Sequence, residues 1–264
     1  MGKLDNRKDH LVELLYEKGE ISIATIAELY DISFPTVRRL CAQLEKERRI
    51  IRIHGGIRPA QAKRNAYKFE TIDSEYAEEK AAIAQYAVGL VNSRQSLFLE
   101  SGTTLKQFAL ALAERIKSNE LTDVIIFTNS MVNLEILQPV CKVIVIGGLY
   151  RPERHDFCGF LSEKLIRALR FDLCFIGADG ISLESGIMAM DSETVHLDEL
   201  LIKNSEKTVL LSISEKFFKN SLISFCSIKD VQLIVTDSKL PQQIRDDYRS
   251  AGADVVCVDS KNGA

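Results

Sequence analysis

Strand-sized apolar runs alternate with helical patterns from about residue 76 to the end of this 264-residue chain. The run "SLFLE" precedes a helical pattern over 105–117, and "DVIIFT" precedes one over 131–137. Continuous apolar strands separated by amphipathic helices are typical of a mostly parallel sheet whose two faces are both covered. The alternation therefore predicts an α/β domain, with further helices expected over 76–91, 162–170, 195–204 and from 241 onward.

Small, hydroxyl-bearing or glycine residues follow most of these strands. They are "SGTT" (101–104), "TNS" (128–130), "GGLYR" (147–151), "ADG" (178–180), "SISEK", which ends at Lys216, and "TDS" (236–238). The carboxyl ends of parallel strands lie along one edge of an open sheet, and ligands bind at that edge. These residues are therefore expected to meet at one crevice.

The "SGTT" stretch directly precedes an apolar helix face formed by Leu105, Phe108, Ala109, Leu112 and Ile116. Backbone amides at a helix N-terminus suit anions, above all phosphate, and Gly102 permits close approach of a ligand. Lys216 is expected to add a positive charge from a neighbouring loop. The alternative is that the Ser and Thr side chains only cap the helix, but the polar clusters after the other strands favour a phosphate site.

The N-terminal part of the chain has the pattern of three short helices. The first is expected at about 4–18, the second after Ser22, and the third from Ser33, a possible cap, to about Glu47. In the third helix, an apolar stripe recurs at helical spacing and predicts the buried face: Val37, Leu40, Cys41 and Leu44. The residues left facing outward are Thr36, Arg38, Arg39 and Gln43.

A basic hairpin is predicted next, because "RRIIRIHGGI" consists of a short strand, a His-Gly-Gly turn and a return strand. Its cations are Arg48, Arg49, Arg52 and Arg58. Residues 36–64 hold nine basic and two acidic residues, although the net charge of the chain is −3. Three helices followed by a basic hairpin indicate a winged helix-turn-helix that reads DNA, rather than a three-helix bundle with a solvated charged face.

The run "TVRRLCAQLEKERRIIRIHGG" is similar to the DNA-binding signature of DeoR-type repressors, in which two arginines precede a basic wing that ends in His-Gly-Gly. The chain departs from that pattern at Leu40, where the family commonly has aspartate, and at Cys41, where it commonly has leucine. The resemblance implies that the chain binds double-stranded operator DNA. The residues that it implies for this contact are Ser33, Thr36, Arg38, Arg39, Gln43, Arg49, Arg52, His54 and Gly55.

The rest of the chain resembles the DeoR effector domain, because "SGTT", "TNS", "GADG" and "KF" occur in the family's order. That domain looks like ribose phosphate isomerase, so the resemblance implies a phosphorylated sugar as effector. Three departures are Arg94 in place of a turn glycine, Asp198 in place of a lysine and Ile213 in place of an aspartate. The implied effector-binding residues are Ser101, Gly102, Thr103, Thr104, Asn129, Gly148, Tyr150, Arg151, Asp179, Gly180 and Lys216.

These patterns divide the chain into a winged helix-turn-helix domain (1–58), a linker (59–75) and an α/β effector domain (76–264). Because recognition helices read paired half-sites, a homodimer or homotetramer is expected. No apolar run is long enough to cross a membrane and none resembles a signal peptide. We therefore expect a cytoplasmic protein whose six cysteines stay reduced.

Catalysis is not expected. The isomerases place an acid before Gly-Ala-Asp, where this chain has Ile176, and their glycine run with its lysine is replaced here by "SLESG". Asp179 remains, but a single carboxylate in a sugar pocket more often binds a hydroxyl than acts as a base. The four histidines lack metal-ligand spacing, and nucleotide-binding motifs are absent, so no metal and no cofactor are expected. The alternative is a sugar phosphate isomerase with a tethered DNA-binding module.

Overall fold

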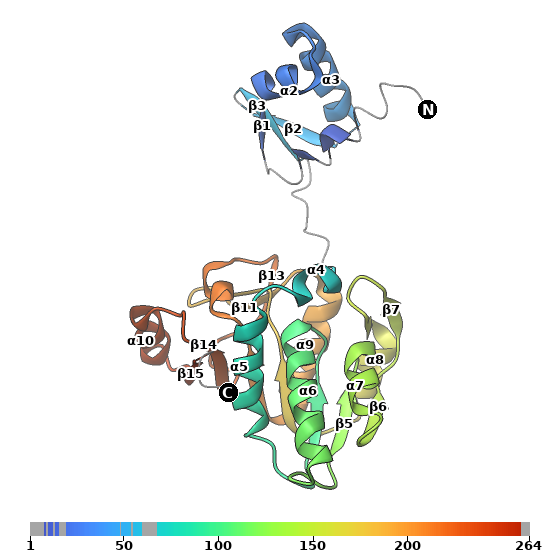
Figure 1. The fold of residues 1–264 in the computed structure, drawn as a ribbon, viewed down its shortest axis with the longest axis vertical. Helices are drawn as coiled ribbons and strands as arrows, with labels where there is room; N and C mark the ends of the chain where they lie inside the picture. Colours follow the sequence, from blue (N-terminus) through green and yellow to red (C-terminus); the bar gives the residue numbers. More distant parts are fainter. Residues whose placement is uncertain are drawn as a thin grey trace. The chain divides into compact units, whose positions relative to one another are not determined.

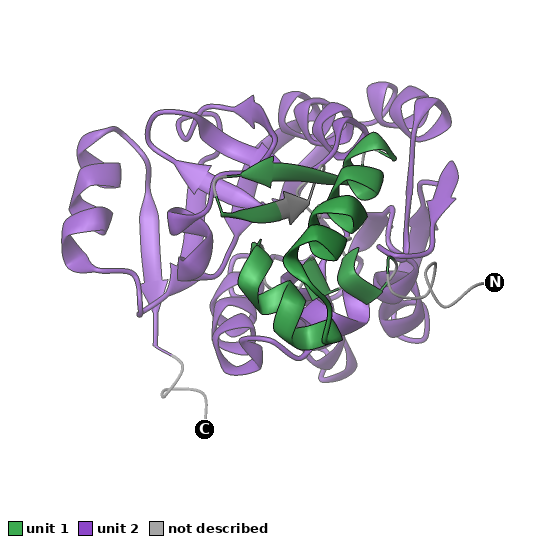
Figure 2. Cartoon of the chain, turned by 90° about the horizontal axis from the view of Figure 1, so that it is seen from above, with its two compact units in different colours: residues 1–66 green, residues 67–264 purple. Residues whose placement is uncertain are grey.

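The computed structural model describes residues 8, 10–12, 14–15, 20–47, 49–53, 55–59 and 68–259. The chain divides into two compact units, a smaller one at Met1–Ala66 and a larger one at Tyr67–Ala264 (Figure 2). Each unit encloses its own hydrophobic core. Within these described ranges, no helix has the length and hydropathy needed to span a membrane.

The smaller unit combines helices with a short antiparallel sheet. Its elements are β1 (Ile21–Ser22), α2 (Ile23–Tyr30), α3 (Phe34–Lys46), β2 (Ile50–Ile53) and β3 (Gly56–Pro59). Residues 8, 10–12 and 14–15 are also helical, and the rest of the first predicted helix (4–18) lies outside the described residues. The strand order is β1-β3-β2, so the β2–β3 hairpin forms a wing after α3 and confirms the predicted winged helix-turn-helix.

The apolar face of α3 forms the centre of the smaller core. Its buried residues are Val37, Leu40, Cys41 and Leu44, as the helical spacing predicted. They pack in one cluster with side chains from the other elements, among them Leu11, Leu15, Ile26, Ile50 and Ile57. Leu40 is 7% exposed and therefore contributes to packing rather than to the outer surface of the helix.

The larger unit contains a seven-stranded parallel sheet with the order β15-β14-β12-β9-β4-β5-β6 (Figure 1). Its strands are β4 (Ser96–Leu99), β5 (Ile125–Thr128), β6 (Lys142–Val145), β9 (Phe171–Ile176), β12 (Ser205–Leu211), β14 (Leu233–Asp237) and β15 (Val255–Val258). The helices beside it are α5 (Ala77–Val88), α6 (Thr103–Lys117), α7 (Met131–Leu137), α8 (Phe160–Arg167), α9 (Ser192–Asn204) and α10 (Gln242–Ser250).

Successive strand residues alternate between two cores, one on each face of the sheet. Leu97 and Leu99 of β4 pack on the face that carries α5, α6 and α7. Phe98, between them, packs on the face that carries α8, α9 and α10. Both faces are therefore apolar, which explains the continuous apolar runs in the sequence and confirms the predicted parallel α/β domain.

Short antiparallel elements that the sequence alternation did not predict lie between the main strands. They are the hairpin β7 (Leu149–Arg151) and β8 (Asp156–Cys158), and a sheet of β10 (Gly180–Ser182), β11 (Gly186–Ala189) and β13 (Ile223–Cys226). A 3₁₀ helix, η1 (Ser214–Phe218), follows β12. These elements follow the carboxyl ends of β6, β9 and β12, so they surround the edge where a ligand is expected.

The predicted linker at 59–75 contains a short helix, α4 (Phe69–Asp73). Phe69 is buried, with 5% of its surface exposed, and its backbone amide donates to the Glu153 carbonyl at 3.0 Å. This helix therefore packs as part of the larger unit. Residues 60–67 lie outside the described part of the chain.

A large-to-small substitution between α6 and the sheet tests the importance of the larger core. Phe108 and Phe175 are fully buried, with their ring centroids 4.2 Å apart. We expect Phe108→Ala to lower the free energy of unfolding by about 3–5 kcal/mol in urea denaturation, because it leaves a cavity. The control Phe160→Ala, at a ring that is 74% exposed, should change it by less than about 0.5 kcal/mol. Equal effects of the two variants would contradict the described packing.

Candidate functional site

The outer face of α3 presents the polar side chains that the sequence predicted. Arg38, Arg39 and Gln43 are exposed and Thr36 is half-buried. Neither arginine forms an ion pair with another residue that the structure describes. Ser33 occupies the N-cap position, but its hydroxyl pairs with the Thr36 hydroxyl at 3.0 Å instead of capping the helix backbone. The prediction that the Ser33 side chain caps the helix was therefore wrong. Arg38 and Arg39 remain exposed on the outer face of α3.

The wing carries further cations, which acidic residues partly neutralise. Arg52 is exposed and lies 3.9 Å from Glu45, while Arg49 is half-buried and lies 3.8 Å from Glu47. Gly55 occupies the turn between β2 and β3 with φ at +78°, a conformation that glycine adopts without strain. His54, Arg48 and the Arg58 side chain lie outside the described residues.

In the larger unit, four of the six sequence-predicted polar clusters follow the carboxyl ends of β5, β4, β9 and β12, which are consecutive strands of the parallel sheet. We call this region the mouth and define it by residues 100–104, 177–179, Asn129 and Lys216. Strands β4 and β9 are neighbours, and the strand order runs in opposite directions from this pair. Such a reversal leaves a crevice where ligands bind in open α/β sheets, so the mouth lies at the expected position.

The N-terminus of α6 forms one wall of the mouth. Gly102 is its N-cap with φ at +132°, and glycine has no side chain that could cap the helix. A Cβ added to Gly102 would approach only a Leu105 methyl, at 3.9 Å, so the space beside it is open. Because the first amides of a helix lack partners within the helix, this end can accept an anion.

Lys216 supplies a cation to the mouth from η1, near the Asp179 carboxylate. Burial lowers the pKa of its ammonium group, and the nearby Asp179 carboxylate opposes that effect. The ammonium group forms no hydrogen bond or ion pair with a residue that the structure describes. An anion bound beside it would therefore restore a favourable partner to a desolvated charge.

Asn129 and Asp179 contribute oriented polar atoms. Asn129 is 1% exposed, and its amide nitrogen donates to the Phe157 carbonyl at 3.1 Å. Its side-chain oxygen is buried and has no hydrogen-bond partner within the described residues. Asp179 accepts a hydrogen bond from the Met190 amide at 2.9 Å, which leaves its second oxygen available.

A buried ionic cluster supports the mouth from the β7–β8 hairpin. Asp156 is fully buried and accepts from both Nε and Nη2 of Arg151, each at 2.7 Å. Arg151 also reaches Asp191 at 2.8 Å, and Arg154 lies 3.4 Å from Asp156. The Ser101 hydroxyl donates to Asp156 at 2.7 Å. Arg151 is thus engaged with the protein's own carboxylates, and it supports the mouth through Asp156.

Three other sequence-predicted residues have structural contacts. A Cβ on Gly148 would lie 2.4 Å from the Cys158 carbonyl oxygen, and one on Gly180 would lie 2.4 Å from the Lys219 carbonyl oxygen. Only glycine permits these close approaches between backbone segments. The Tyr150 hydroxyl lies 3.2 Å from Nδ1 of His155, at the side of the hairpin.

Two buried acids at the mouth were not predicted as site residues. Glu100 is 4% exposed, and its Oε2 accepts from the Gly177 amide at 2.7 Å. Burial raises the pKa of Glu100 to about 7. Asp198 of α9 is 1% exposed, burial raises its pKa well above the usual range, and the Glu100 charge adds to that effect. A carboxylate immediately after a buried strand was the available signal for Glu100.

The other departures from the DeoR pattern also have structural explanations. Arg94 adopts φ of +69°, so it takes the left-handed turn conformation for which the family commonly uses glycine. Ile213 is 6% exposed and packs in the core that carries α5, α6 and α7. The position of the aspartate common in the family is therefore apolar and closed in this chain.

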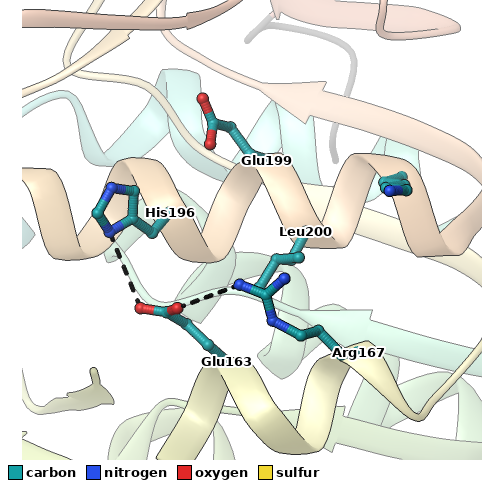
Figure 3. A pocket seen from close by; sticks show the side chains of 6 residues that line it. Glu163, Arg167, His196, Glu199 and Leu200 are labelled. Atoms are coloured by element: carbon teal, nitrogen blue, oxygen red, sulfur yellow. Dashed lines mark ion pairs between the residues drawn. The ribbon is translucent and has the colours of Figure 1, made fainter. Parts of the chain in front are cut away.

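A separate hollow lies between α8 and α9 (Figure 3). The Glu163 carboxylate lies 3.5 Å from the Arg167 guanidinium and 3.9 Å from Nδ1 of His196. No sequence-predicted site residue is among the residues that line this hollow. Nor does any cluster of three or more His, Cys, Asp or Glu side chains in the described ranges have an arrangement suited to a metal ion.

The raised pKa of Glu100 predicts a pH-dependent effect of its substitution. Ionisation of this buried carboxyl opposes folding; the penalty is absent well below pH 4.5 and complete above pH 7. Glu100→Gln keeps an acceptor for the Gly177 amide and should stabilise the protein by up to about 3 kcal/mol at pH 8, and far less at pH 4. Thermal denaturation measures the difference, with exposed Glu184→Gln as control. A pH-independent difference would contradict the assigned pKa direction.

Comparison with protein families gives matches to both units. A model of the DeoR-like helix-turn-helix domain matches residues 7–62, and a model of the DeoR C-terminal sensor domain matches residues 75–238. A lactose phosphotransferase system repressor of Staphylococcus epidermidis is 30% identical over 90% of this chain and 93% of its own length. The transcriptional regulator GlpR of Haloferax volcanii is 28% identical over 95% of this chain and 96% of its own length.

Among solved structures, ribose 5-phosphate isomerase A from Methanocaldococcus jannaschii aligns with a TM-score of 0.38 and 19% identity, over 52% of each chain. The family models carry the assignment, because the sensor-domain match alone spans more than half of the sequence. With a helix-turn-helix domain at its N-terminus and a sensor domain after it, this protein belongs to the DeoR family of transcriptional regulators.

Proposed function

We propose that this protein represses a sugar-metabolism operon and that a phosphorylated sugar bound at the mouth controls it. The observation that carries the proposal is that the first turn of α6, which begins after Gly102, and the partly buried Lys216 both follow strands at the carboxyl edge of the sheet, and that Lys216 has no ion-pair partner among the described residues. A phosphoryl group would receive hydrogen bonds from the first and a charge partner from the second. The lactose phosphotransferase system repressor, a relative along most of its length, supports a link to sugar metabolism.

The sugar part of the effector would lie beside the carboxylates and the amide of the mouth. Asp179 has one oxygen available, and the Asn129 side-chain oxygen has no partner among the described residues. Oriented acceptors of this kind bind hydroxyl groups and reject ligands that cannot donate to them. A thermal-shift screen against pentose and hexose phosphates tests this proposal, since a ligand that prefers the native state raises its melting temperature.

Sensing is favoured over the alternative of a sugar phosphate isomerase with a tethered DNA-binding module. The pKa of Glu100 is about 7, a value that suits a general base near neutral pH, and this observation favours an enzyme. However, its Oε2 is bound to the Gly177 amide and the side chain is 4% exposed. A coupled assay with several sugar phosphates separates the two, because turnover that Asp179→Asn abolishes would favour the enzyme.

Control of DNA binding requires the effector to bind two conformations with unequal affinity. Paired recognition helices read half-sites about one helical turn apart, so the repressor is proposed to act as a homodimer or homotetramer. A repressor bound to operator DNA would act in the cytoplasm. An effector that changes the spacing of two α3 helices would then change operator affinity without touching DNA.

The exposed arginines of α3 give a prediction for DNA binding. Arg38→Ala or Arg39→Ala should weaken binding to a duplex selected from a random-sequence library, because each removes a cation from the helix that enters the groove. A variant that loses a phosphate contact should also reduce the salt slope by about one unit. Fluorescence anisotropy at several salt concentrations measures both effects. The control is Arg167→Ala, which removes an exposed arginine from the larger unit. If the α3 variants bound the duplex as tightly as this control, the assignment of α3 as the DNA-contacting helix would be refuted.

The mouth gives a second prediction, which concerns the response of the protein to sugar phosphates rather than its affinity for DNA. Lys216→Ala removes the proposed phosphate partner, and Thr103→Val removes a hydroxyl from the first turn of α6. Both variants should bind the selected duplex as the wild type does, yet lose the melting-temperature increase caused by the best compound of the sugar phosphate panel. Lys203→Ala, on α9 at the separate hollow, is the control. A normal ligand response in both mouth variants would place the phosphate site elsewhere.

A further inference from the structure

We propose that α4 couples occupancy of the mouth to DNA binding, by docking against or releasing from the larger unit; this inference rests on the function proposed above. Helix α4 (Phe69–Asp73) is the first element of the larger unit along the chain, directly after the residues that lead to it from the smaller unit. In Figure 1 it lies near the hairpin that carries β7. Two sets of contacts connect it with the mouth, one through the β7–β8 hairpin and one through the first turn of α6.

The first set joins the N-terminal end of α4 to the β7–β8 hairpin. The Phe69 amide donates to the Glu153 carbonyl at 3.0 Å, and the Phe69 ring packs edge-on against His155 with centroids 5.6 Å apart. His155 Nε2 lies 2.7 Å from a Glu70 oxygen. The other ring nitrogen of His155 lies 3.2 Å from the Tyr150 hydroxyl. One histidine thus connects the side chains of α4 with those of the hairpin.

The hairpin in turn contacts the loops of the mouth. Asp156, next to His155 in the chain, accepts the Ser101 hydroxyl hydrogen bond at 2.7 Å. Phe157 exchanges two hydrogen bonds with Asn129, through its amide at 2.8 Å and its carbonyl at 3.1 Å. Ser101 and Asn129 belong to the loops after β4 and β5. A ligand that reorders these loops would therefore displace the hairpin against which Phe69 packs.

The second set joins the C-terminal end of α4 to the first turn of α6. Lys106 Nζ lies 2.5 Å from the Asp73 carboxylate, and the Lys106 amide closes the first helical turn on the Gly102 carbonyl at 2.9 Å. Lys80 of α5 is 2% exposed and donates to the Ile72 carbonyl at 2.6 Å. An anion at the α6 N-terminus acts on the same turn that holds Asp73. Both ends of α4 are thus coupled to the mouth.

The short length of α4 suits it to act as a two-state element, either docked and helical or released. A helix of five residues cannot persist without packing, because nucleation is unfavourable and few hydrogen bonds follow it. Its helical state therefore depends on the contacts of Phe69, Glu70 and Asp73. A ligand that strengthens these contacts shifts the population toward docked α4, and docked α4 strengthens ligand binding by the same factor.

The experiment uses the full chain, a labelled duplex selected from a random-sequence library, and inorganic phosphate as the probe. Duplex affinity is measured without and with phosphate, while chloride keeps the ionic strength constant. Two variants weaken opposite ends of α4, Phe69→Ala and Asp73→Asn. Glu114→Gln is the matched control, because it removes a Lys–carboxylate pair of the same kind on α6, between Lys117 and Glu114 at 2.8 Å. Hydrogen exchange of the peptide that contains α4 is followed in parallel.

We expect phosphate to increase exchange protection of α4 in the wild type and to change duplex affinity several-fold. Phe69→Ala and Asp73→Asn should reduce that change at least three-fold and weaken phosphate binding, although neither residue belongs to the mouth. Glu114→Gln should behave as the wild type. If phosphate changed duplex affinity in both α4 variants as much as in the wild type, the α4 proposal would be overturned and the proposed sensor function would stand. If the wild type did not bind phosphate, and Lys216→Ala did not change the response to phosphate, both the α4 proposal and the proposed sensor function would be overturned.

Discussion

The buried carboxylate of Asp156 holds together the parts of the larger unit that form the candidate effector site. It is fully buried, accepts a two-point contact from Arg151, and also accepts the Ser101 hydroxyl. Through Arg151 the same cluster reaches Asp191, the N-cap of α9. Removal of one partner from a buried ion pair typically costs about 3–5 kcal/mol, because it leaves an uncompensated charge. The positions of the β4 loop, the hairpin and the start of α9 therefore depend on one another.

The parallel sheet was predictable because its helices cover both faces. Each strand needed an apolar run, and Leu97, Phe98 and Leu99 show how adjacent residues serve opposite cores. The small antiparallel strands were not predictable in this way. Strands of three residues, such as β7 and β8, are too short to show a period, and their contacts are with residues distant in sequence. Helix α4 was missed for the same reason, since Phe69 is buried by the hairpin rather than by a neighbour in sequence.

The parts of the candidate site that could be predicted are those whose residues can be recognised from their neighbours in sequence. The "SGTT" loop and Lys216 could be recognised because glycine, hydroxyl groups and a cation have clear uses beside a helix N-terminus. The roles of Gly148 and Gly180 depend on backbone segments that approach from elsewhere in the chain. Asp198 resembles a surface residue in sequence, and the raised pKa values of Glu100 and Asp198 follow from their burial in the folded chain. The roles of these glycines and acids are therefore decided by tertiary packing and not by residue type.

The separation of the two hydrophobic cores has an evolutionary consequence. Each unit closes its own apolar interior, so recombination near residue 66 would leave both interiors intact. A sensor exchanged at that point would bring α4 with it, and with α4 the contacts that connect this helix to the effector loops. Lineages, or designers of biosensors, could therefore acquire a new DNA specificity by replacing the N-terminal DNA-binding unit while retaining the larger unit and its proposed effector site.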